Sequence, residues 1–142
     1  MEVANHNGVS ITNGVLTAEN IIGGFSSYWD ALRNYVWIGE NAELHIDTGT
    51  IIGGEGETAH QNQVMIHTGK PISSIGCVDG AAAETRAAYN QVSIQDSKIE
   101  KCWYMTGAIS NHVTNNNRFS LQGIASVSSL GIAGDFPGQK IL

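Results

Sequence analysis

The side chains that could bind a metal ion are five histidines and two cysteines, and their spacing argues against a site. The histidines are His6, His45, His60, His67 and His112. None shows the spacing of an HExxH motif or of another ligand pair on one element. Cys77 and Cys102 lie outside any CxxC or Cys/His cluster. We expect isolated surface histidines, two buried free thiols and no metal site, with a disulfide between neighbouring units as the alternative for the cysteines.

The 13 acidic residues would supply the catalytic groups if the chain cleaved polysaccharides. Such enzymes gather two or three carboxylates on one face. Glu40 and Asp96 each lie six residues past a recurring asparagine, but Thr68 takes that place in the unit between them. No place in the repeat collects acids from consecutive units, and no GxSxG or phosphate-binding motif occurs. The pattern predicts no catalytic or cofactor site, and the acids are expected to be solvated edge charges.

Aromatic residues are the remaining candidates, for contact with sugar rings. Trp37 lies between Val36 and Ile38, so strand alternation directs it away from the core that these two residues would form. With Tyr35 it forms a candidate glycan-contact surface, because exposed apolar patches mark interaction sites. The alternative, which we favour, is a structural surface that a neighbouring coil of a longer protein would cover.

Composition narrows the class of protein. Only 14% of residues are charged, 17 are glycine, and the formal net charge is −6. The seven lysines and arginines are scattered singly, which argues against nucleic-acid binding. No apolar run approaches the roughly 20 residues of a membrane helix. The start of the chain lacks the basic and apolar segments of a secretory signal, which indicates a cytoplasmic protein or a fragment of a longer secreted one.

A repeat of 27–28 residues runs along the chain. Each unit starts with an asparagine followed by two apolar residues at alternate positions. The units are Asn7 with Val9 and Ile11, Asn34 with Val36 and Ile38, Asn62 with Val64 and Ile66, Asn90 with Val92 and Ile94, and Asn117 with Phe119 and Leu121. This alternation is typical of a half-buried strand, so all ten apolar residues are expected in one core. The asparagines would stack as a hydrogen-bonded ladder and adopt the left-handed backbone of a corner.

Within each unit, an apolar pair leads into glycine, as at Ile21 to Gly24 and Ile51 to Gly54. We interpret these glycines as corner residues with positive φ. An alanine stands three residues before Asn34, Asn62 and Asn90. The segments 25–33, 55–61, 81–89 and 108–116 are expected to be loops or a third, variable face. Segment 81–89 is alanine-rich and could form a turn or two of helix.

The repeat predicts an all-β protein, a right-handed single-stranded parallel β-helix of about five coils. A propeller blade needs more residues, a leucine-rich repeat needs a different leucine pattern, and helical repeats need amphipathic helices. The right hand is expected from the general preference of parallel crossovers. We interpret residues 1–142 as one solenoid domain, with units starting near 7, 34, 62, 90 and 117, and as a fragment of a longer repeat protein. Segment 135–142 breaks the pattern and is expected to be a cap or a truncation point.

The units resemble the passenger repeats of Gram-negative autotransporter adhesins. The resemblance is carried by Asn20-Ile-Ile-Gly-Gly-Phe-Ser-Ser-Tyr28, leading through Ala31 to Asn34-Tyr-Val-Trp-Ile38, and it weakens in later units. It implies a right-handed β-helix on the bacterial surface, exported through an outer-membrane barrel and used in adhesion or as a stalk. The chain lacks the signal peptide and barrel of that family, so we expect a passenger fragment or a degenerate copy.

Three functional hypotheses follow from these observations. The first is a non-catalytic structural or adhesive module at the cell surface, with a host-surface glycan or protein as its partner. The second is a carbohydrate-binding or carbohydrate-cleaving β-helix, such as a polysaccharide lyase or a phage tail-spike segment. The third is a filament formed by end-to-end self-association, because a solenoid without strong caps exposes strand edges.

Overall fold

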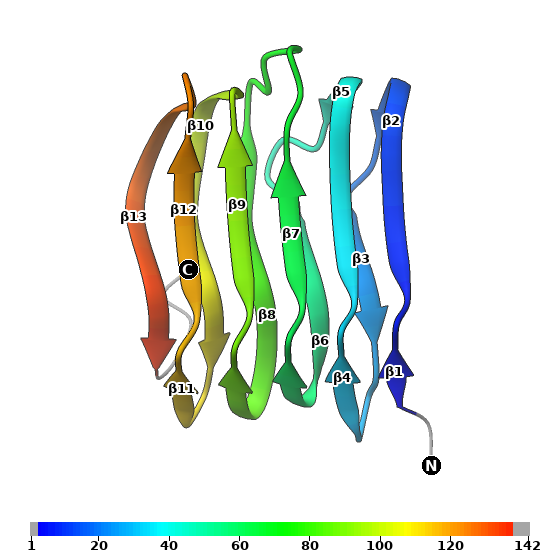
Figure 1. Ribbon diagram of the computed structural model, residues 1–142, viewed down its shortest axis with the longest axis vertical. Coiled ribbons are helices and arrows are strands. Elements are labelled where there is room, and N and C mark those ends of the chain that lie inside the picture. Colours follow the sequence, from blue (N-terminus) through cyan, green and yellow to red (C-terminus); the bar gives the residue numbers. More distant parts are fainter. Residues whose placement is uncertain (1–2, 138–142) are drawn as a thin grey trace.

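The protein is an all-β solenoid of about five turns, built from parallel strands (Figure 1). The structure is a computed structural model that describes residues 3–137. Within that range it contains no helix, and therefore none long and apolar enough to cross a membrane. The all-β fold and the parallel stacking predicted from the repeat are confirmed.

Two parallel sheets form the walls of the solenoid, and each turn contributes to both. The five-stranded sheet, here the B sheet, contains β2 (Gly8–Thr17), β5 (Tyr35–His45), β7 (Gln63–Ile66), β9 (Gln91–Gln95) and β12 (Arg118–Gln122). The eight-stranded A sheet contains β1 (Ala4–Asn5), β3 (Asn20–Phe25), β4 (Asp30–Leu32), β6 (Thr50–His60), β8 (Ile75–Ala88), β10 (Lys98–Ser110), β11 (Val113–Asn115) and β13 (Ser126–Pro137). In Figure 1 the B-sheet strands stand side by side in the order of the coils.

Strand register reproduces the sequence repeat. Val36 pairs with Val9 on one side and with Val64 on the other, and the same column continues to Val92 and Phe119. Six side chains in the three middle coils are fully buried: Val36, Ile38, Val64, Ile66, Val92 and Ile94. Stacked apolar side chains therefore form the core, as alternation predicts.

The last coil departs from the predicted core. Leu121 was expected to be buried with Ile94, yet it is 47% exposed. It lies on β12, which pairs only with β9 among the described strands. Burial in a solenoid requires a neighbouring coil on each side, and in the described part of the chain Leu121 has one on only one side.

The segment 81–89 does not form the helical turns that its alanines suggest. Residues up to Ala88 continue β8, which pairs with β6 on one side and with β10 and β11 on the other. Ladders on both edges bond the backbone, and tertiary context overrides a weak helix propensity. Ala87 of this segment stacks in a column with Ala59 and Ala31 of the two preceding coils, and all three side chains are fully buried. The expected variable face is thus largely regular strand.

The left-handed residues at the corners are not the recurring asparagines of the repeat. In every unit the residue immediately before the asparagine has positive φ, between 54° and 60°. These residues are His6, Arg33, Gln61, Tyr89 and Asn116. The prediction that the recurring asparagine itself takes this backbone is wrong. The preceding residue turns the chain from the A sheet to the B sheet, and the asparagine amide remains available for bonds along the stack.

The glycines of the apolar-pair motif are also placed differently from the prediction. They lie inside A-sheet strands, and the positive-φ glycines among the described residues are Gly14 and Gly123. Strand register aligns Gly23, Gly53, Gly80, Gly107 and Gly134 in one column. A Cβ on Gly53 would lie 2.4 Å from the carbonyl oxygen of Gly80, and one on Gly80 would lie 2.3 Å from that of Gly107. These glycines are required for close backbone approach, not for left-handed turns.

Candidate functional site

The recurring asparagines form one continuous hydrogen-bonded column, here the asparagine column, whose members are Asn7, Asn34, Asn62, Asn90 and Asn117. The Oδ1 atom of Asn62 accepts bonds from the backbone N–H and the Nδ2 of Asn34, at 2.9 and 3.0 Å. Nδ2 of Asn62 donates to Oδ1 of Asn90 and to the carbonyl oxygen of Ala31, both at 2.9 Å. Each middle member is buried, and both its amide oxygen and its amide nitrogen make hydrogen bonds within the column or to the backbone, so the column is structural.

The column continues past its last asparagine through a carboxylate. Asp135 Oδ1 accepts bonds from the backbone N–H of Asn117 at 3.1 Å and from its Nδ2 at 2.7 Å. Asp135 therefore supplies the acceptor that a further asparagine would provide. Sequence reasoning expected a cap or a truncation point over 135–142, and this contact is cap-like; residues 138–142 lie outside the described range. No spacing signal identifies it, because Asp135 follows Asn117 by only 18 residues.

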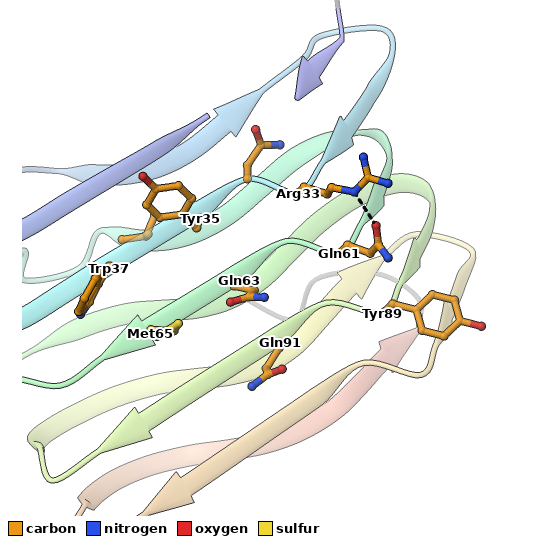
Figure 2. Close-up of a pocket in the computed structure, with 10 residues that line it drawn as sticks. Arg33, Tyr35, Trp37, Gln61, Gln63, Met65, Tyr89 and Gln91 are labelled. Atoms are coloured by element: carbon orange, nitrogen blue, oxygen red, sulfur yellow. Dashed lines mark hydrogen bonds between the residues drawn. The ribbon is translucent and has the colours of Figure 1, made fainter. Parts of the chain in front are cut away.

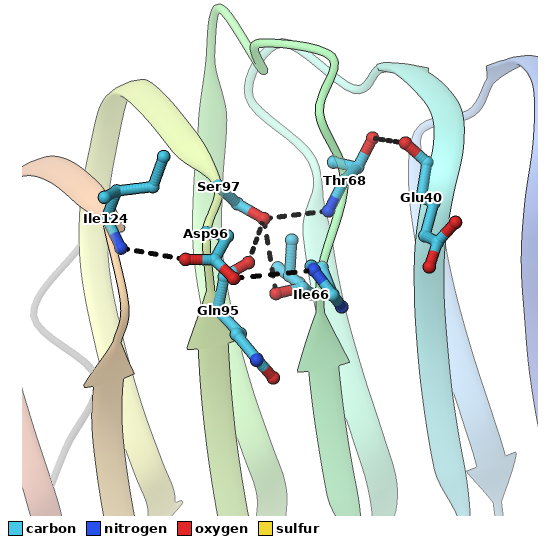
Figure 3. A network of polar contacts seen from close by, with 8 residues as sticks. Glu40, Ile66, Thr68, Gln95, Asp96, Ser97 and Ile124 are labelled. Atoms are coloured by element: carbon cyan, nitrogen blue, oxygen red, sulfur yellow. Dashed lines mark hydrogen bonds and ion pairs between the residues drawn. The ribbon is translucent and has the colours of Figure 1, made fainter.

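The two acids in equivalent places of the repeat, Asp96 and Glu40, belong to coils that are separated by the coil of β7. Figure 3 shows Asp96 accepting a 2.9 Å bond from the backbone N–H of Ile124, and its other oxygen lies 3.7 Å from His67 Nε2. The Thr68 hydroxyl donates to the Ala42 carbonyl at 2.6 Å, and Thr68 separates Asp96 from Glu40. Residues 3–137 contain no group of three or more potential metal ligands.

Two buried polar features were missed or left open by sequence reasoning. Asp79 is 3% exposed and accepts a 2.5 Å bond from the Thr106 hydroxyl on the next coil. Cys77 and Cys102 are free thiols, so the disulfide alternative does not hold in this structure. Burial, followed by the nearby Cys77 and Asp79, raises the pKa of the Cys102 thiol to about 12. A thiol that stays protonated near neutrality is a poor nucleophile.

A shallow groove crosses the outer face of the B sheet, and Tyr35 and Trp37 line it (Figure 2). It is called the B-sheet groove below. Its floor is formed by outward side chains of β5, β7 and β9, namely Tyr35, Trp37, Gln63, Met65 and Gln91. Its edge is formed by the corner residues Arg33, Gln61 and Tyr89. Trp37 is 44% exposed and Tyr35 42%, in agreement with the predicted outward direction of Trp37. Sequence reasoning missed Met65, although its place between Val64 and Ile66 carries the same alternation signal.

The orientation of Tyr35 has a local cause. Tyr35 pairs with Gly8 on β2, and a Cβ on Gly8 would lie 2.2 Å from two Tyr35 ring atoms. The ring therefore lies across the bare backbone of Gly8. This contact gives Tyr35 a structural role, since an aromatic ring that covers a cross-strand glycine stabilises the pair. It also leaves part of the ring open to the groove.

The chemistry of the groove favours binding. Its lining consists of aromatic, amide and thioether side chains with Arg33 as the charged member. Arg33 Nε donates a 3.0 Å bond to Gln61 Oε1 on the next coil. Among the residues that the structure describes, no carboxylate lines the groove, so the pair of carboxylates that most glycoside hydrolases use is not found there.

Comparisons with known proteins do not assign the chain to a family. No protein-family model, no curated protein and no solved structure matches it. The similarity to autotransporter passengers therefore remains a resemblance of the repeat.

Proposed function

We propose that this chain is a non-catalytic adhesive module of a bacterial cell surface, of the passenger type that its repeat resembles. In this proposal the B-sheet groove is the contact surface for a host-surface glycan or protein. The observation that carries the proposal is the exposed pair Tyr35 and Trp37 on β5. Because β5 already pairs with β2 on one side and β7 on the other, a further coil stacked at an end of the solenoid would leave this pair uncovered. Exposed aromatic residues in a shallow polar groove are typical of interaction surfaces.

The solenoid supports this role mechanically. Its coils are joined by parallel ladders and by the buried asparagine column, so the outer face is held by a continuous hydrogen-bonded wall. Groups on rigid strands keep their spacing when a ligand binds, which reduces the entropy lost on binding. The competing proposal is a carbohydrate-cleaving β-helix, and the hydrolases of that class would use a pair of acids that the groove lining does not contain.

A binding assay combined with a cleavage assay tests the proposal. The purified protein is applied to an immobilised glycan array and to host cells, and soluble products are assayed for new reducing ends. We expect binding without release of products, and loss of binding in Trp37→Ala. Tyr28→Ala is the matched control, because Tyr28 is 78% exposed and does not line the groove. Release of reducing ends, or equal binding by Trp37→Ala and the wild type, would contradict the proposal.

A further inference from the structure

We infer that the B-sheet groove binds a polysaccharide chain that bears carboxylates, with its length along the solenoid axis. This inference rests on the proposed function, in which the groove is the contact surface. It adds the class of ligand, its charge and its direction. Three observations carry it: the charge of the groove lining, the N–H donors of Arg33 that Gln61 does not occupy, and the position of the Tyr35 ring over Gly8.

The charge around the groove is opposite to that of the whole chain. The chain has a net charge of −6, yet the charged member of the groove lining is Arg33. Along the stack, Tyr35 is in register with Gln63, then with Gln91, and then with Arg118. Arg118 thus lies at the far end of this row without lining the groove, and Arg33 lies at the corner near Tyr35. The ion pairs of the described residues include neither Arg33 nor Arg118. A positive charge in this groove, on a chain of net negative charge, favours an anionic ligand at this place.

Arg33 is oriented for a carboxylate. Its Nε is occupied by Gln61 Oε1, and this bond holds the guanidinium at the edge of the groove (Figure 2). The two terminal nitrogens remain as donors, and a planar pair of N–H groups matches the two oxygens of a carboxylate. The left-handed backbone of Arg33, with φ of 54°, places the residue at the corner, directly before Asn34 and two residues before Tyr35.

The groove floor is suited to sugar rings. The Tyr35 ring lies over Gly8, and Trp37 stands two residues further along the same face, so two aromatic surfaces are offered beside each other. The amides of Gln63 and Gln91 continue the row at the coil spacing of roughly 4.8 Å. Amide groups both donate and accept, as binding to sugar hydroxyls requires. An acidic peptide would match the arginines but would make less use of this aromatic and amide floor.

The test uses a short oligogalacturonate and its methyl ester, which has the same sugar rings without the charge. Binding of the intact protein to each probe is measured by isothermal titration calorimetry at low and high salt. We expect the acid to bind at least roughly tenfold more tightly than the ester, and the difference to shrink as salt rises. Equal affinity for both probes would overturn the inference, and so would binding of a sulfated polysaccharide with no binding of oligogalacturonate.

The arginine variant makes the test specific. Arg33→Gln should lower the affinity for the acid roughly tenfold, because it removes a charge-assisted bond, and should leave the affinity for the ester unchanged. The variant is compatible with the fold, since Gln61 occupies the equivalent corner with φ of 57°. Lys101→Gln, on β10 of the A sheet, is the control for loss of one positive charge. An unchanged affinity of Arg33→Gln for the acid would overturn the inference.

The failure of this inference can be told apart from failure of the proposed function. Binding of neutral glycans that is lost in Trp37→Ala would overturn the carboxylate assignment and leave the adhesive role standing. Adhesion to cells that does not depend on Trp37, together with no binding of either probe, would overturn both.

Discussion

The asparagine column and the B-sheet groove are made by adjacent residues of the same coils, yet they follow opposite rules. In the column one residue type recurs in all five units, and each middle member is buried and satisfied on both sides. One residue further along, the outward position changes from Gly8 to Tyr35, Gln63, Gln91 and Arg118. Repetition therefore marks the positions that hold coils together, and variation marks the surface where a particular ligand can be recognised.

The sharpest way to break this contrast is a substitution within the column. Asn62→Ala should lower the free energy of unfolding by about 3 kcal/mol, because it strands the buried donors of Asn34 and an acceptor on Ala31. The neighbouring change Gln63→Ala, on the exposed face, should alter stability by no more than about 0.5 kcal/mol. Urea unfolding followed by circular dichroism measures both. Similar losses of unfolding free energy in the two variants would show that the asparagine column contributes no more to stability than the exposed position beside it.

The glycine column offers a second test of the repeated positions. Gly53→Ala should destabilise the protein by about 2 kcal/mol, since the new methyl group would meet the backbone carbonyl of Gly80. Gly69→Ala is the matched control, because the nearest atom to its added Cβ is 3.7 Å away. Its effect should stay within about 0.5 kcal/mol. Thermal unfolding would refute the close-approach explanation if Gly53→Ala were as stable as Gly69→Ala.

What could be predicted from sequence follows the same division. The alternating apolar residues and the evenly spaced asparagines are signals of residue type, and they led to the fold, the core of the middle coils and the outward direction of Trp37. The left-handed corners carry no such signal, since His6, Arg33, Gln61 and Tyr89 share no chemistry. Their backbone is imposed by the change of direction between sheets. The strand at 81–88 was missed because pairing on both edges, which no local window contains, decides its conformation.

A smaller effect on stability is expected at Tyr35, which lies on the variable surface but also makes a structural contact. Its ring belongs to the groove but also covers Gly8, so Tyr35→Ala should lower stability by about 1 kcal/mol as well as weaken binding. Tyr35→Phe keeps the ring over Gly8 and should restore stability. Gln91→Ala, in the same outward row, serves as the control with little effect on unfolding. If Tyr35→Ala left the midpoint of urea unfolding unchanged, the contact of the ring with Gly8 would contribute nothing to stability.

The smallest effect should come from His60, at the end of β6. Burial, and then the nearby Arg86, lowers the pKa of His60 below its usual 6.5, while Asp30 acts in the opposite direction. A lowered pKa means that the unfolded chain binds more protons than the folded one near and below pH 6.5. Stability linked to His60 is therefore present above about pH 6.5 and is lost as pH falls through the folded-state pKa. Urea unfolding at pH values on both sides of 6.5 should show a smaller loss of unfolding free energy at acid pH in His60→Gln than in the wild type. An identical pH dependence in His60→Gln and the wild type would mean that the desolvation of this histidine makes no measurable contribution to stability.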